Sequence, residues 1–71
     1  MTIHDAYRLS ERGEVLGELH SIKMTDIGII AVIGKVSVLL PHELAGELQG
    51  FIGRGIGVLR LEGYHVCCLE G

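Results

Sequence analysis

The chain has 71 residues, enough for one small domain and too few for two, because folding units usually run to about 100–150 residues. Nine Asp and Glu residues against six Lys and Arg give a formal charge of −3, which argues against a protein that binds nucleic acid mainly through the phosphate backbone. Apolar residues make up 48% of the sequence, which argues against a disordered polypeptide and is a large share for so small an interior. We therefore expect some apolar surface to face a partner.

The sequence contains no candidate membrane span, because Gly34 and Lys35 interrupt the longest apolar run, residues 27–41, well short of the roughly 20 residues required. The first residues lack the basic head and apolar middle of a secretory signal, so we expect a cytoplasmic protein. Cys67 and Cys68 are adjacent, whereas disulfide-stabilised domains of this size usually carry four or more spaced cysteines. Both thiols are therefore expected to be reduced.

Residues 1–13 alternate only loosely between apolar and polar side chains, which fits either an edge strand or an N-terminal arm. They end in the polar turn Ser10–Gly13. The domain proper is expected to comprise residues 14–71.

Residues 14–25 predict a long strand with a fault in its alternation. The apolar positions of its first half share one face: Val15, Gly17 and Leu19. Ile22 and Met24 lie in the opposite phase, and a β-bulge at residues 20–21 would bring them to the same side. Such a bulged strand is typical of a first barrel strand that bends between two sheets.

Two shorter strands are predicted next. Residues 25–28 form a turn, and residues 29–33 are a short β-branched apolar run between glycines, which indicates a buried strand. Gly34-Lys35 suits a two-residue type II′ hairpin turn. The strand at residues 36–40 is expected to point Val36, Val38 and Leu40 inward and Ser37 outward.

A helix is predicted after Pro41, which suits the first helical position. Its apolar side chains repeat at helical spacing and form one stripe: Leu44, Leu48, Phe51 and Ile52. Gly53 is expected to end the helix.

The last two strands are predicted at residues 56–61 and 64–69, joined by Glu62-Gly63 as a two-residue turn. That turn would set Val58 opposite Cys67. Both sides of the hairpin carry apolar residues, but only one side can face the interior of a barrel. The other side is therefore expected to be covered from solvent, most simply by a second copy of the chain. The predicted interaction face consists of Ile56, Val58, Cys67 and Leu69.

The order strand, strand, strand, helix, strand, strand over residues 14–70 resembles the OB-fold, a five-stranded Greek-key barrel. An SH3-like barrel is the alternative, but the apolar stripe over residues 44–52 favours the OB-like barrel. The segment 51–60 is similar to the helix-to-strand passage of small uncharacterised archaeal proteins of this type, a resemblance that implies no activity.

Glycine-rich residues 53–57 could suggest a phosphate loop, but phosphate loops follow a strand and open a helix, whereas this segment does the reverse. It is interpreted as a helix end and a strand start.

His65, Cys67 and Cys68 could suggest a zinc site, yet neighbouring strand residues point to opposite faces. Only His65 and Cys67 share a face, and spacing supplies no further ligands from His4, His20 and His42. Cys67 lies beside a histidine, but no third residue is evident that would complete a catalytic nucleophile. Glu43 and Glu47 are interpreted as solvated charges on the helix surface and not as an acid–base pair. We therefore expect neither an enzyme nor a metal or other cofactor.

The function predicted first is that of a non-enzymatic assembly module. It would bind a second copy of itself or another protein through its surplus apolar face, and pairing of strands at an exposed sheet edge is one route to that association. The alternative is a single-stranded nucleic-acid binder, as the OB-fold resemblance implies. Its candidate residues are Lys23, Lys35, Arg60, Tyr64 and His65. Phe51 belongs to the helix stripe, which leaves only Tyr7 and Tyr64 to stack on bases.

Overall fold

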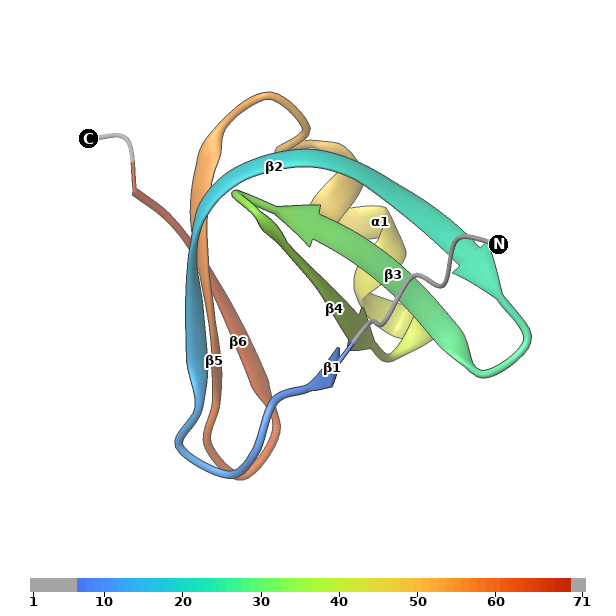
Figure 1. Ribbon diagram of the computed structural model, residues 1–71, viewed down its shortest axis with the longest axis vertical. Helices are drawn as coiled ribbons and strands as arrows, with labels where there is room; N and C mark the ends of the chain where they lie inside the picture. Colours follow the sequence, from blue (N-terminus) through green and yellow to red (C-terminus); the bar gives the residue numbers. More distant parts are fainter. Residues whose placement is uncertain (1–6, 70–71) are drawn as a thin grey trace.

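The computed structural model describes residues 7–69, which form a six-stranded sheet with one short helical segment against it (Figure 1). The strands are β1 (Tyr7–Arg8), β2 (Glu14–Thr25), β3 (Gly28–Ile33), β4 (Val36–Leu40), β5 (Gly55–Arg60) and β6 (Tyr64–Cys68). A 3-10 turn, η1 (His42–Leu44), leads directly into the helix α1 (Ala45–Gln49). The predicted succession of three strands, a short helix and two strands is confirmed for β2 to β6.

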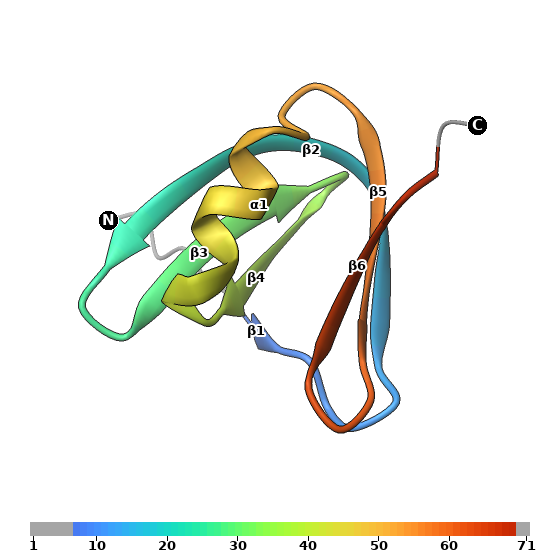
Figure 2. The ribbon, with the colours of Figure 1, turned by 180° about the vertical axis from the view of Figure 1, so that it is seen from behind.

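The strand order in the sheet is β1-β4-β3-β2-β5-β6, and every neighbouring pair is antiparallel except β1 and β4. Because β1 and β6 stand at opposite ends of this order, the sheet formed by residues 7–69 is open. Residues 7 and 8 of the predicted arm form the edge strand β1, while residues 1–6 lie outside the described residues. Figure 2 shows α1 lying across the side of the sheet formed by β2 and β3.

β2 is long and strongly curved, and its two halves pair with different strands (Figure 1). Residues 14–18 pair with β5 and residues 19–25 pair with β3. The register shifts between Leu19 and Ser21, which confirms the predicted bulge. The bulge brings Ile22 against the core beside the fully buried Leu19, whereas Met24 is 59% exposed near the strand end.

The turn between β3 and β4 packs closely against the bend in β2. Its backbone φ of 62° at Gly34, with Ile33 paired to Val36, confirms the two-residue connection. The Gly34 amide donates a hydrogen bond to the Glu18 carbonyl oxygen (2.8 Å). A Cβ atom on Gly17 would lie 3.1 Å from the Gly34 Cα atom, so the approach of the two backbones requires glycine.

The core lies between the two parts of the sheet and α1. The described residues contribute one cluster of buried apolar side chains: Leu9, Val15, Leu19, Ile29, Ala31, Ile33, Val38, Leu40, Leu48, Ile56 and Val58. The inward placement predicted for β4 is confirmed for Val38 and Leu40 but is wrong for Val36, which is 37% exposed beside the turn.

The helix is shorter than the segment over which the predicted apolar stripe extends, residues 44–52. Leu48 is fully buried, and Leu44 and Phe51 pack against the core as half-buried side chains. Ile52, predicted to share the stripe, is 46% exposed. The reason is that α1 ends at Gln49 and the chain turns away through residues 50–53, so helical spacing no longer applies there.

The hairpin between β5 and β6 differs from the prediction by one residue. Arg60 pairs with Tyr64, so the loop has three residues, Leu61 to Gly63. Glu62 and Gly63 have φ values of 50° and 128°, and the Leu61 amide donates a hydrogen bond to the Gly63 carbonyl oxygen (2.8 Å). A shift of one residue moves every side chain of a strand to the other face of the sheet.

The predicted interaction face is therefore wrong as a set. Val58 lies opposite Val66 instead of Cys67, and both Ile56 and Val58 are fully buried in the core. Cys67 is exposed and Leu69 is 50% exposed, on the opposite side of β6. The hairpin does expose apolar side chains to solvent, but they belong to a different set of residues from the predicted one.

The segment before β2 is tied to the same hairpin. The Arg12 amide donates to the Arg60 carbonyl oxygen, and the Arg60 amide donates to the Gly13 carbonyl oxygen (2.9 Å). The Glu62 amide donates to a Glu11 carboxylate oxygen (2.8 Å).

No helix among residues 7–69 combines the length and the apolar character required to cross a bilayer.

Candidate interaction surface

The solvent-facing side of β2, β5 and β6 carries a group of apolar residues that the pairing registers place next to one another. Gly57 lies opposite Leu16 on one side and opposite Cys67 on the other. Leu59 and Leu69 occupy the neighbouring positions on the same side of β5 and β6. We call this surface the outer face: Leu16, Gly57, Leu59, Cys67 and Leu69.

The centre of the outer face is an exposed apolar cluster. Leu16 is 56% exposed and Leu69 is 50% exposed, although both are large aliphatic side chains. A Cβ atom on Gly57 would lie 2.6 Å from Leu16 Cδ2, 3.4 Å from Cys67 Sγ and 3.7 Å from Leu69 Cδ2. These three side chains therefore converge over the bare backbone of Gly57, which is buried beneath them.

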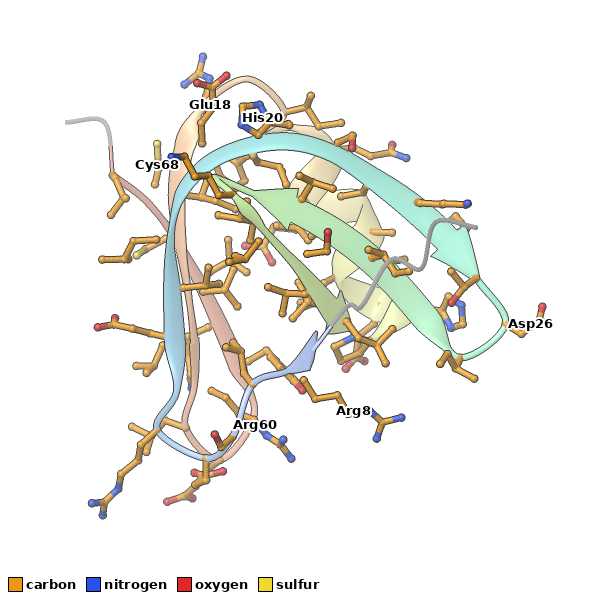
Figure 3. All side chains as sticks on the ribbon, viewed as in Figure 1. Arg8, Glu18, His20, Asp26, Arg60 and Cys68 are labelled. Carbon is orange, nitrogen blue, oxygen red and sulfur yellow. The ribbon has the colours of Figure 1, made fainter. Side chains whose placement is uncertain are left out.

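Charge on the outer face is confined to one margin. Glu14 and Glu18 lie along β2, paired with Leu59 and Gly55. The Glu18 carboxylate is 3.8 Å from the ring of His20, and Figure 3 shows both side chains at the bend of β2. None of the outer-face residues is a lysine or an arginine, and β6 has no Lys, Arg, Asp or Glu. The apolar centre can therefore meet another surface without burying a charge.

β6 is also the last strand of the sheet. The Leu69 amide donates to the Gly55 carbonyl oxygen (2.9 Å), which fixes the alternation of hydrogen bonds along the hairpin. The amides of His65 and Cys67 consequently face β5. Those of Tyr64 and Val66 face the other side of β6, where no strand lies among residues 7–69.

The residues predicted to bind nucleic acid do not share one surface. Lys23 is on the solvent side of β2, and Lys35 is in the turn between β3 and β4. His65 lies on the side of β6 that carries Cys67, with Nε2 2.9 Å from the Leu61 carbonyl oxygen. Only Arg60 and Tyr64 are brought together, with Arg60 Cζ 5.5 Å from the centre of the tyrosine ring.

Arg60 and Tyr64 open onto a surface hollow of about 260 Å³ at the end of the sheet. Its lining comes from β1, the turn after β2, the end of β4 and the last hairpin: Arg8, Ile27, Leu39, Leu40, Pro41, Arg60 and Tyr64. Arg8 was not among the predicted site residues. The parallel pairing of β1 with β4 brings it here, and no local pattern in the sequence signals that pairing.

The described residues offer no cluster for metal binding, since no three His, Cys, Asp or Glu side chains gather among residues 7–69. His42 has its Nε2 2.6 Å from the Thr25 carbonyl oxygen and links η1 to the end of β2. The Cys67 thiol is exposed within the apolar cluster of the outer face.

Comparisons with known protein families, with curated protein sequences and with solved structures found no significant match to this chain. The outer face and the hollow are therefore interpreted from their own chemistry.

Proposed function

We propose that this chain is a small self-associating module in which two copies meet through their outer faces. The observation that carries the proposal is the convergence of Leu16, Cys67 and Leu69 over Gly57. Exposed aliphatic side chains gathered on one sheet face are a typical contact surface, because their removal from water stabilises association by roughly 25 cal/mol per Å². The order of elements from β2 to β6 supports the OB-like architecture as part of the same proposal.

A second copy fits this surface better than a charged partner does. The centre of the outer face is uncharged, and its two carboxylates, Glu14 and Glu18, lie at the β2 margin. Two identical faces can meet about a twofold axis with apolar centres in contact and the carboxylates in water at the rim. Binding of single-stranded nucleic acid through all five predicted residues is not proposed, because they lie on separate surfaces.

Sedimentation equilibrium of the full chain tests the proposal directly. We expect a mass near twice 7.7 kDa at high protein concentration. Leu16→Glu should shift the protein to the monomer, because dimerisation would bury the new carboxylate. Ile52→Glu is the matched control: Ile52 is 46% exposed but follows α1 and is not one of the outer-face residues, so this variant should keep the dimer mass. A monomeric wild-type protein at millimolar concentration would refute self-association.

Single-cysteine variants locate the contact. With Cys68→Ser, a short bis-maleimide should link Cys67 to its copy in high yield, because Cys67 lies within the apolar cluster. With Cys67→Ser, the remaining Cys68 points to the other side of β6 and should give little linked dimer. Equal yields from the two variants would contradict contact through the outer face.

Hydrogen exchange separates face packing from addition of β6 strands edge to edge. Face packing leaves the Tyr64 and Val66 amides without a new strand partner, so both should exchange rapidly in the monomer and in the dimer. Protection of both amides that appears only in the dimer would show strand addition and overturn face-to-face packing.

A further inference from the structure

We propose that the hollow between Arg8, Arg60 and Tyr64 is a binding site for a small organic anion, a phosphate group carried on an apolar body. This site is separate from the outer face and does not depend on self-association. Figure 3 shows Arg8 and Arg60 projecting at the same end of the molecule, close to β1. Both line the hollow of about 260 Å³, which is slightly smaller than the usual pocket for a drug-sized ligand and limits the ligand to a small molecule.

The charge at this site is unusual for the chain. Two of the six Lys and Arg residues line the hollow, whereas none of the Asp and Glu residues within the described range 7–69 does. Among residues 7–69, neither Arg8 nor Arg60 forms an ion pair with a carboxylate. Two guanidinium groups directed at one hollow repel each other, and an anion between them converts that repulsion into attraction.

Arg60 is already held in place for such a ligand. Its Nη1 donates a hydrogen bond to the Leu9 carbonyl oxygen (2.7 Å), and its Cζ lies 5.5 Å from the centre of the Tyr64 ring. A guanidinium group has five N–H donors, so this hydrogen bond leaves most of them for a ligand. Because the side chain is restrained before binding, little conformational entropy is lost when an anion arrives.

Arg8 supplies the second charge from a different element. Its side chain is exposed, and its place in the lining of the hollow depends on the pairing of β1 with β4. Phosphate oxygens accept bidentate hydrogen bonds from arginine, and a dianionic phosphate can satisfy two guanidinium groups at once. This favours phosphate over a single carboxylate.

The rest of the lining is apolar, which points to more than a bare phosphate ion. Leu39, Leu40 and Pro41 form one wall, and Ile27 projects from the turn after β2 with 72% of its surface exposed. An apolar group attached to the phosphate would cover Ile27 and remove that side chain from water. Because one face of the Tyr64 ring is occupied by Arg60, the contact is with aliphatic walls more than with a stacked ring.

The test is an NMR titration of the full chain with phenyl phosphate, inorganic phosphate, benzoate and benzyl alcohol at low salt. We expect phenyl phosphate to bind at least tenfold more tightly than each of the other three, with shifts centred on Arg8, Ile27 and Tyr64. Raising the salt concentration should weaken the binding. Equal affinity for benzyl alcohol or for inorganic phosphate would overturn the proposal, as would shifts centred elsewhere.

Arg8→Ala and Arg54→Ala form a matched pair for this site. Arg8→Ala should weaken phenyl phosphate binding at least tenfold, because a charge-assisted hydrogen bond is lost. Arg54 is exposed, precedes β5 and does not line the hollow, so Arg54→Ala should leave the affinity within twofold. Equal effects of both changes would show a non-specific charge effect and refute the site.

Two further arms separate this proposal from its alternatives. The monomeric Leu16→Glu variant should bind phenyl phosphate as the wild type does, so failure of self-association leaves this site testable. An oligonucleotide without a terminal phosphate should bind more weakly than phenyl phosphate. Tighter binding of that oligonucleotide would instead identify a surface for the nucleic-acid backbone and overturn the proposal.

Discussion

Gly28 shows how a single residue limits the approach of two strands. It begins β3 with φ of 156°, and a Cβ atom there would lie 2.5 Å from the Leu40 carbonyl oxygen. That oxygen belongs to the backbone of β4, so it cannot move aside as a flexible side chain can. The close pairing of β3 with β4 at this end therefore depends on the missing side chain.

We expect Gly28→Ala to lower the free energy of unfolding by about 1–3 kcal/mol, because the added methyl group overpacks the backbone of β4. Gly46 in α1 is the control, since a Cβ atom there meets nothing within 4 Å. Gly46→Ala should raise the free energy of unfolding by about 0.5–1 kcal/mol. Urea unfolding followed by circular dichroism measures both, and equal changes would contradict the backbone clash.

At the scale of elements, η1 and α1 contribute one fully buried side chain to the core. Leu48 is fully buried, whereas the other members of the predicted stripe are half-buried or exposed. A helix of five residues has little stability of its own, so its position depends on this packing.

Leu48→Ala should lower the free energy of unfolding by about 2–5 kcal/mol, the usual range for removing a buried leucine side chain. Ile52→Ala removes a similar side chain from a position that is 46% exposed and should cost less than about 1 kcal/mol. Thermal unfolding of the two variants, side by side, checks the difference. Similar losses would mean that Ile52 packs as the helical spacing predicts.

The sequence predicts most elements but not how the last hairpin pairs. The bulge in β2 could be predicted because the alternation of apolar and polar residues breaks there. The turn at Gly34 could be predicted because glycine adopts the positive φ that a two-residue hairpin turn requires. Glu62-Gly63 admits both a two-residue and a three-residue loop. The structure adopts the longer loop with Glu62 at positive φ, and this single residue exchanges the inner and outer sides of β6.

For the whole molecule, the hollow was the least predictable feature, because its charges come from opposite ends of the chain. Arg60 and Tyr64 could be grouped from the hairpin pattern, but the partnership of Arg8 with them depends on a short parallel pairing. The apolar surplus itself was predictable from composition. Its location was not, since it required the register of β5 and β6.

The residues described before β2, 7–13, contact the rest of the domain. Leu9 is 4% exposed in the core, and its carbonyl oxygen accepts a hydrogen bond from Arg60. A variant that begins at Glu14 should lose at least about 3 kcal/mol of unfolding free energy, since it loses a buried leucine and several hydrogen bonds. Chemical denaturation compares it with the full chain and with Leu9→Ala, which should lose less. Full stability of the shortened variant would show an independent unit at residues 14–71.

The curvature of β2 has a consequence for how the domain unfolds. One uninterrupted strand supplies hydrogen-bond partners to β3 along one half and to β5 along the other. Neither hairpin can detach from β2 without exposing side chains that the other hairpin also covers, so denaturation should occur as one concerted event with no half-melted species.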